Sequence, residues 1–336
     1  YYDQAWLKIY DVPVLYFPKF FHPDPTVKKQ SGFLMPSFEN STNIGTSLAL
    51  PYYHIINNNS DFTLKPRYFS NDKILLQSEY RNVSKNSKNI FDFSLFNEEN
   101  SPSKSHFFSR SIKNLNLENF LESELDLQVQ LSSNDTYLKT YKLKSPIIKD
   151  TNLLTTSLSM NAYNEDTSLN LDFSSYENLS KIDSDRFEFV YPSYYISKIL
   201  DTDERYEGNF TFITNGFVKN YDTNIFEKVA INDLLFNSNP KISNFGLKSN
   251  YNLLIKNVNA DSTNSDKYKN KRSHDISSII EYNSSIPLKK EGENYKNILT
   301  PKVSFKYSPN ETKDISDESR RIDVNNIFSI NRISSN

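Results

Sequence analysis

Strict alternation of apolar and polar residues is the feature of this sequence that most limits its possible folds. In residues 124–131 (ELDLQVQL) an apolar side chain occupies every second position, and residues 168–173 and 302–307 follow the same pattern. Because successive side chains of a β-strand point to opposite faces of its sheet, this period predicts strands. Similar segments lie near 46–56, 61–69, 73–83, 88–96, 137–143, 154–163, 187–196, 209–218, 247–256 and 274–282.

Polar breaks rich in Asn, Asp, Ser and Lys separate the predicted strands. Residues 56–61 and 70–73 are short breaks, whereas 257–275 and 309–323 are long ones. A mixture of short turns and long loops is typical of the two rims of a transmembrane barrel. Only residues 115–122 have apolar side chains at a spacing that suits a helical turn.

The composition favours a membrane barrel over a soluble sheet. Soluble sandwiches usually turn with Gly and Pro, yet the 336 residues include only 6 glycines. Aromatic residues near the predicted strand ends suit interfacial girdles, although β-propensity alone also places them in strands. No run of 18 apolar residues predicts a transmembrane helix. A transmembrane strand, however, needs only about ten residues of alternating character.

Charge, cysteine content and motifs exclude several classes of function. With 39 basic and 41 acidic residues, the chain lacks the basic surface of a nucleic-acid-binding protein. The absence of cysteine removes disulfides, thiolate zinc sites and cysteine nucleophiles. No glycine-rich phosphate loop or nucleophile elbow occurs. The four histidines, His22, His54, His106 and His274, form no pair with metal-ligand spacing. We therefore expect no enzyme, no metal site and no cofactor.

The segment from Phe17 to Phe38 is a proline-rich connector. It contains four prolines and one glycine: Pro18, Pro23, Pro25, Pro36 and Gly32. Each proline fixes its own φ and pushes the preceding residue toward extended geometry, so the connector is expected to be stiff. Gly32 is the one position at which we expect it to bend sharply. An ordinary inter-domain linker would explain the same prolines, but its many aromatic side chains predict docking against the rest of the protein.

Residues 5–17 read as one or two strands interrupted by Pro13. This stretch is too short to bury a core, so we expect it to be the last piece of a β domain whose body lies upstream. The chain begins at Tyr1 without a signal-peptide pattern, which we interpret as a mature or truncated product. The chain is therefore expected to be a fragment.

Two prolines, Pro51 and Pro66, lie inside the first two predicted strands after the connector. A proline within a strand deletes a hydrogen bond of the ladder. Their presence in adjacent strands predicts a leading edge of the sheet that pairs weakly, although an edge strand can also simply tolerate proline.

Several blocks of the chain resemble the LptD family (also called OstA or Imp) of outer-membrane lipopolysaccharide-assembly proteins. The connector, VPVLYFPKFFHPDPTVKKQSGFLMPSF, is similar to the family's junction between periplasmic β-jellyroll and barrel. TSLALPYYHI and FTLKPRYFS look like its first two barrel strands, prolines included. Three later blocks also resemble the family: SSNDTYLKTY (132–141), ILTPKVSFKYSP (298–309) and NNIFSINRIS (325–334). The long loops match nothing.

The resemblance implies an all-β fold in two parts. Residues 1–38 would be the end of the jellyroll and the junction, and residues 39–336 the N-terminal part of a large antiparallel transmembrane barrel. At about ten residues per strand, the chain would hold roughly twelve to fourteen strands and leave the barrel unclosed. Its edges at Leu48–Ile56 and near Ile327 would then be unpaired.

The resemblance also implies transport without covalent chemistry. In the family, lipopolysaccharide arrives over an LptA-type periplasmic bridge, slides through the jellyroll and leaves sideways through a seam between the first and last strands. Pro51 and Pro66 would weaken that lateral gate. The lipid route would include Val14, Tyr16, Phe17 and Phe20, and the junction Pro23, Pro25 and Gly32. An LptE-type lipoprotein would plug a lumen lined by Lys65, Arg67, Gln77, Glu79, Arg81, Glu124, Asp126 and Gln128.

The implied location is the outer membrane of a Gram-negative bacterium, with the N-terminal segment in the periplasm. Many family members carry cysteines for an inter-domain disulfide, which this chain lacks. Two alternatives stay open: another outer-membrane barrel such as a porin or receptor, and a surface β protein that binds a glycan or a partner.

Overall fold

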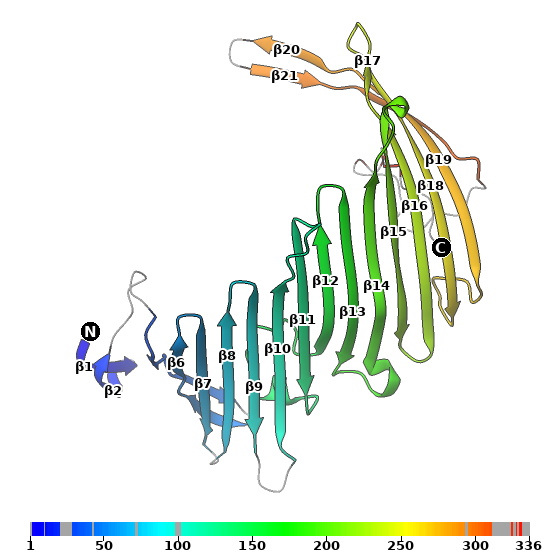
Figure 1. The fold of residues 1–336 in the computed structure, drawn as a ribbon. Helices are drawn as coiled ribbons and strands as arrows, with labels where there is room; N and C mark the ends of the chain where they lie inside the picture. Colours follow the sequence, from blue (N-terminus) through cyan, green and yellow to red (C-terminus); the bar gives the residue numbers. More distant parts are fainter. Residues whose placement is uncertain are drawn as a thin grey trace. The chain divides into compact units, whose positions relative to one another are not determined.

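The chain is an antiparallel β protein in the computed structural model, which describes residues 2–9, 11–20, 29–41, 44–70, 73–97, 102–292, 295–310, 324, 327, 329 and 330. The strands are β1 (Tyr2–Ile9), β2 (Val12–Phe20), β3 (Gly32–Phe33), β4 (Ser37–Ser41), β5 (Gly45–Ala49), β6 (Tyr52–Asn57), β7 (Ser60–Phe69), β8 (Ile74–Val83), β9 (Ser87–Phe96), β10 (Lys104–Asn114), β11 (Glu122–Ser132), β12 (Leu153–Tyr163), β13 (Thr167–Asn178), β14 (Phe187–Leu200), β15 (Gly208–Tyr221), β16 (Ile225–Ser238), β17 (Lys241–Ile242), β18 (Lys248–Thr263), β19 (Ser273–Ser285), β20 (Leu288–Gly292), β21 (Tyr295–Leu299) and β22 (Lys302–Tyr307). The helices are α1 (Tyr137–Thr140), η1 (Asp183–Arg186) and η2 (Glu204–Tyr206) (Figure 1). The all-β, antiparallel prediction is confirmed. Within the described residues, no helix is long and apolar enough to cross a membrane.

The chain divides into two compact units. Unit 1 comprises Tyr1–Phe107 and Ser132–Ser145, and unit 2 comprises Phe108–Leu131 and Pro146–Asn336. The stretch Ser132–Ser145 therefore packs with strands that precede it by more than thirty residues. The predicted domain boundary at residue 38 falls inside β4, and the division into a jellyroll end and a barrel stays a prediction.

The sheet of unit 1 begins one strand earlier than the sequence suggests. β4 pairs with β5, with Phe38 opposite Leu48, and β3 pairs with β6, with Phe33 opposite Tyr52. The expectation of an unpaired edge at Leu48–Ile56 is thus wrong. The segment from Gly32 to Ser41 lacks a long alternating run, yet β3 and β4 within it pair with β6 and β5.

The next strands of unit 1 form a regular ladder. β5 and β6 both pair with β7 in one continuous register, from Ser47 opposite Phe69 to Ile55 opposite Asp61. β8 pairs with β7, and β9 pairs with β8. A separate two-stranded sheet contains β1 and β2, in agreement with the prediction of one or two strands in residues 5–17. Pro13 does not interrupt them as expected, because it lies inside β2, next to a register shift.

Unit 2 contains the longer strands. Its order is β11, β12, β13, β14, β15, β16, β18, β19 and β22, with each strand pairing with the next. β17 adds two residues to the edge of β18, and β20 and β21 form a separate ribbon. β16 has 14 residues and was not among the predicted segments, because its mixed sequence IFEKVAINDLLFNS hides the period of two.

Both units expose apolar side chains and bury polar ones. On β9, Phe93 and Leu95 are 43% and 37% exposed, whereas Asp92 and Ser94, which point the other way, are 0% exposed. On β19 of unit 2, Ile280 is 52% exposed and Glu281 only 1%. A water-soluble sheet shows the reverse arrangement, so the exposed face of each unit needs an apolar environment. We call the two sides the apolar face and the polar face.

Two local predictions were wrong. Residues 137–143, predicted as a strand, instead contain α1, whose buried residues are Tyr137 and Leu138. These side chains and Tyr141 lie at helical spacing (i, i+1, i+4), which a period of two does not capture. Residues 115–122, predicted as a helical turn, form a non-helical connection that enters β11.

Candidate functional site

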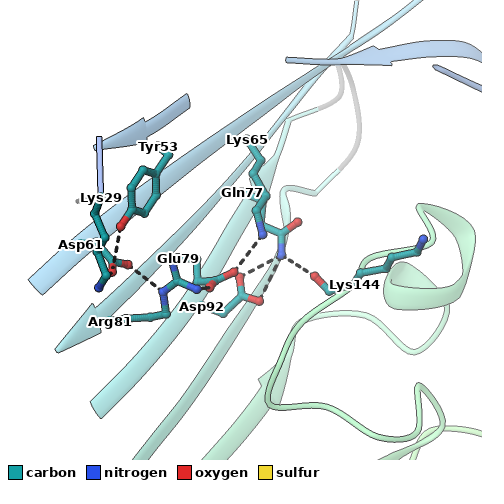
Figure 2. Close-up of polar contacts among 9 residues, drawn as sticks. All are labelled: Lys29, Tyr53, Asp61, Lys65, Gln77, Glu79, Arg81, Asp92 and Lys144. Carbon is teal, nitrogen blue, oxygen red and sulfur yellow. Dashed lines mark hydrogen bonds and ion pairs between the residues drawn. The ribbon is translucent and has the colours of Figure 1, made fainter. Parts of the chain in front are cut away.

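The candidate functional site is the polar face of unit 1. Figure 2 shows the row of polar side chains that crosses it. Lys65 of β7 donates to Glu79 of β8 at 2.9 Å, and Gln77 of β8 donates to Asp92 of β9 at 3.0 Å. These residues alternate with the exposed apolar residues of the same strands, so the period of two places them here. The prediction that Lys65, Arg67, Gln77, Glu79 and Arg81 share one face agrees with their register.

One end of this face is covered by the stretch Ser132–Ser145, which we call the infolded segment. Arg67 Nη1 donates to the carbonyl oxygen of Tyr141 at 2.6 Å. Gln77 Nε2 donates to the carbonyl oxygen of Lys144 at 2.9 Å (Figure 2). Backbone carbonyls of a loop that lies against a sheet need donors, and these two side chains supply them.

A small aromatic core lies under the infolded segment. The ring of Tyr141 lies 4.4 Å from that of Phe96 and 5.8 Å from that of Phe69, measured between centroids. Leu138 and Leu75 are also buried. Burying an apolar side chain of this size stabilises a fold by about 1.5–3 kcal/mol, so the infolded segment is packed and not merely tethered.

A buried polar network holds α1 against β9. Ser94 Oγ lies 2.5 Å from His106 Nδ1 and 2.7 Å from the hydroxyl of Tyr137, and His106 Nε2 lies 3.3 Å from Asp92 Oδ1. The serine, histidine and aspartate are arranged like a nucleophile, its base and an orienting acid. All three are buried, however, and Tyr137 occupies the position at which a reacting atom would sit. The network therefore anchors the infolded segment.

Tyr137 is suited to this position only in its neutral form. Burial raises the pKa of Tyr137 to about 12, and the hydrogen bond to Ser94 opposes that rise. The phenol therefore stays protonated at physiological pH and remains available as a donor to the network.

The other end of the polar face is open. A pocket of about 760 Å³ lies there, and an adjoining pocket of about 440 Å³ shares part of its wall. Lys29 of the connector pairs with Asp61 of β7 at 3.3 Å. Arg81 of β8 donates to the same carboxylate at 2.7 Å, and the hydroxyl of Tyr53 lies 3.2 Å from it. The two ends of one face therefore differ: side chains of the infolded segment fill one, and the other is an open, charged pocket.

Pro51 and Pro66, the two prolines predicted to weaken a gate, lie almost opposite one another. In the continuous register of β5, β6 and β7, Leu50 lies opposite Pro66, and its N–H donates to the Pro66 carbonyl at 3.0 Å. The reciprocal bond cannot form because proline has no N–H. On the other side, Leu34 N–H donates to the Pro51 carbonyl at 2.8 Å, and again proline cannot return the bond.

A backbone irregularity accompanies these missing bonds. The register of β4 with β5 and that of β3 with β6 differ by one residue, so residues 34–36 lie opposite residues 50 and 51. Each proline thus removes one donor from a different seam. Pro66 of β7 removes it from the seam between β7 and the continuous stretch of β5 and β6. Pro51, which lies between β5 and β6, removes it from the seam of that stretch with β3 and β4.

The remaining predicted residues lie in several places. Val14, Tyr16, Phe17 and Phe20 belong to β2, and Tyr16 is half-exposed with its ring 4.8 Å from that of Trp6. Pro23 and Pro25 lie outside the described residues. Gly32 starts β3 opposite Tyr53, and the glycines with positive φ in the described chain are Gly45 and Gly246. Gly32 therefore has no left-handed backbone, and the sharp bend expected there stays a prediction.

The predicted polar residues of unit 2 lie on β11. Asp126 pairs with Arg110 of β10 at 2.7 Å, and Gln128 donates to the Thr155 carbonyl at 3.3 Å. Glu124 is exposed. Sequence reasoning missed Asp92, Ser94, His106 and Tyr137. For the first two a signal existed, because they alternate with Phe91, Phe93 and Leu95.

Comparison with known proteins identifies the family. A family model described as LptD protein matches residues 2–182, more than half of the chain. The chain belongs to the LptD family. Among its LptD relatives, that of Pseudomonas entomophila (strain L48) is 39% identical over 98 residues, and that of Pseudomonas aeruginosa (strain UCBPP-PA14) is 36% identical over 95 residues. Both are named LPS-assembly protein LptD, which describes assembly and not enzymatic catalysis.

The alignments with the curated LptD relatives are partial. They cover 29% and 28% of this chain, and 10% of the length of each relative. A solved bacterial polysaccharide outer membrane secretin is 10% identical, with a TM-score of 0.28 over 78% of this chain and 89% of its own. A likeness of that size carries no further conclusion.

Among the described residues, no group of three His, Asp or Glu side chains could hold a metal ion.

Proposed function

We propose that this chain is part of an outer-membrane barrel that transports lipopolysaccharide and inserts it into the outer leaflet. The observation that carries the proposal is the inverted sheet of an LptD-family chain: exposed Phe93 and Leu95 alternate with buried Asp92 and Ser94. Such a sheet suits lipid on one side and a polar lumen on the other. The location would be the outer membrane of a Gram-negative bacterium, because the family relatives assemble lipopolysaccharide by name.

The test of this proposal is complementation with the full-length gene that contains this chain. Cells depleted of their own LptD are expected to regain surface lipopolysaccharide and resistance to large apolar antibiotics when they express it. Its partner lipoprotein should be expressed alongside. A protein that reaches the outer membrane at normal levels but restores neither property would contradict the proposal.

The proposed route runs from β2 to the seam beside the prolines. Val14, Tyr16, Phe17 and Phe20 would guide the acyl chains on a periplasmic jellyroll, and the lipid would leave sideways near Pro51 and Pro66. Two features support this exit: each proline removes one ladder bond, and a one-residue register change lies at the same level. An LptA-type bridge would deliver the lipid, and an LptE-type lipoprotein would occupy the lumen.

Replacing both prolines with alanine is expected to slow export. Each new N–H can complete one ladder bond, which is worth about 0.5–1.5 kcal/mol. Together they would stabilise the closed seam by about 1–3 kcal/mol, so the appearance of new lipopolysaccharide at the surface should fall about tenfold. Pulse labelling of surface lipopolysaccharide measures this rate. Pro102→Ala, in an exposed position before β10, is the matched control. Unchanged export in the double variant would remove the gate from Pro51 and Pro66.

The infolded segment supports a further part of the proposal. It fills one end of the polar face through Tyr137, Leu138 and Tyr141. In a barrel it would narrow the lumen from within. We therefore propose that it helps to keep the lumen closed to water-soluble molecules while lipid leaves on the other side of the sheet.

A further inference from the structure

The open pocket of unit 1 contains more positive than negative charge. Asp61 is shared by Lys29 at 3.3 Å and Arg81 at 2.7 Å. Glu79 is shared by Lys65 at 2.9 Å and Arg81 at 3.4 Å. Three cations thus pair with two carboxylates, and Lys85 adds a fourth cation to the wall. An additional anion would balance this surplus.

The cations also offer more donors than the two carboxylates use. Arg81 contacts the carboxylates through Nε and Nη1, and each lysine contacts one carboxylate oxygen. A guanidinium and an ammonium each carry several N–H donors. The side chains of Lys29 and Arg81 are 63% and 43% exposed, so their remaining donors can reach a ligand in the pocket. Asp61 and Glu79, only 8% exposed, lie beneath them and fix their positions.

This arrangement fits a phosphate group better than a single carboxylate. A phosphate has several oxygens in a tetrahedral arrangement, and it can accept from a guanidinium and from ammonium groups at the same time. Charge-assisted hydrogen bonds of this kind are among the strongest that proteins form. The pocket of about 760 Å³ is also much larger than a phosphate, so a larger molecule that carries one can enter.

We propose that the pocket lined by Lys29, Arg81 and Lys85 binds a phosphate group of the transported glycolipid. The assignment to a glycolipid rests on the proposed function, whereas the affinity for phosphate rests on the pocket alone. Lys29 lies within the connector, just before β3, so the pocket lies where the connector enters the sheet. A phosphorylated headgroup held there would remain on the polar face while its acyl chains follow an apolar path.

The test measures binding to the full-length protein in detergent. Three probes are titrated by calorimetry: inorganic phosphate, a bisphosphorylated glycolipid, and the same glycolipid without its phosphates. The variant is the double substitution Lys29→Gln and Lys85→Gln, which leaves the Arg81 pairs with both buried carboxylates in place. The control is Lys88→Gln with Lys149→Gln, which removes the same charge from exposed lysines that do not line the pocket.

The wild-type protein and the control are expected to bind inorganic phosphate and the phosphorylated glycolipid. Their affinity for the dephosphorylated glycolipid should be lower by a factor of about ten or more. The pocket variant should lose about tenfold in affinity for both phosphorylated probes while melting at the control's temperature. Equal affinities in variant and control would overturn the site. If the protein binds inorganic phosphate but does not bind the phosphorylated glycolipid, the lipid assignment is overturned.

Failure here and failure of the proposed function give different results. If complementation fails and the pocket variant still loses phosphate affinity, the transport proposal falls and the phosphate site stands. If complementation succeeds and phosphate affinity is the same in variant and control, the phosphate site alone falls.

Discussion

Replacing Tyr137 with alanine is expected to release the infolded segment from the polar face of unit 1. The substitution removes a fully buried ring and its hydrogen bond to Ser94, and it leaves a cavity between α1 and β9. Losses of this kind cost about 3–5 kcal/mol. The packing of Leu138 and Tyr141 and the carbonyl contacts from Arg67 and Gln77 remain, but they should not hold the segment without the ring of Tyr137.

Limited trypsin digestion of the full-length protein measures this release. Lys139, Lys142 and Lys144 lie in the infolded segment and become cleavable when it leaves the sheet. Cells that carry the variant should also admit large polar antibiotics that the wild type excludes. Tyr137→Phe keeps the ring and loses only the hydroxyl, so it should cost about 1 kcal/mol and remain largely protected. Tyr206→Ala, at an exposed position in η2, is the control. Protection equal to that of wild type in Tyr137→Ala would show that the segment is held elsewhere.

The sequence predicts the sheet well because alternation acts locally. Asp92 and Ser94 between Phe91, Phe93 and Leu95 place polar and apolar side chains on opposite faces, and the ladder of β8 and β9 realises that pattern. The same pattern cannot say which face is covered. A period of two looks the same in a soluble sheet and in a membrane sheet, and only the burial of Asp92 with the exposure of Phe93 separates them.

The parts that the sequence did not predict depend on contacts distant in the chain. β3 and β4 are strands only because β6 and β5 offer them a ladder, and their own residues show no clear period. Residues 137–143 contain Tyr137, Tyr141 and Leu143, which also read as an alternating strand. The helix forms there because Tyr137 and Leu138 can both enter the space over Ser94 and Leu75. Tertiary packing of this kind overrides local preference.

The open pocket shows the same limit. The family resemblance implied that Lys65, Glu79 and Arg81 line one face, and the register of β7 and β8 agrees. Lys29 was not predicted, because it lies within the proline-rich connector, which has no period. Its position beside Asp61 arises from the return of the connector along β6, where Ser31 Oγ accepts the N–H of Ile55 at 2.9 Å.

Replacing Arg67 with methionine is expected to loosen both the first strands and the infolded segment. Arg67 joins three parts of unit 1: Nη2 pairs with Glu39 of β4 at 2.7 Å, Nε donates to Ser47 of β5 at 2.9 Å, and Nη1 donates to the Tyr141 carbonyl at 2.6 Å. Methionine retains the apolar stem of the side chain but provides none of these donors. The carboxylate and the carbonyl then lose a charged partner, at a cost of about 2–4 kcal/mol.

Two measurements on Arg67→Met separate this role from general instability. Amide hydrogen exchange should become faster in β4, in β5 and in the infolded segment together, because all three contact the Arg67 guanidinium. β8 and β9 should stay protected. Arg67→Lys keeps the charge but lacks the planar fork that reaches all three partners. Its exchange rates should therefore lie between those of wild type and Arg67→Met. Arg205→Met, which removes an exposed arginine beside Asp203, is the control and should change neither region. If β4 and the infolded segment respond separately, Arg67 does not couple them. If they respond together, Arg67 couples the first strands, which carry the proposed seam, to the infolded segment. Release of lipid at that seam would then be linked to closure of the lumen.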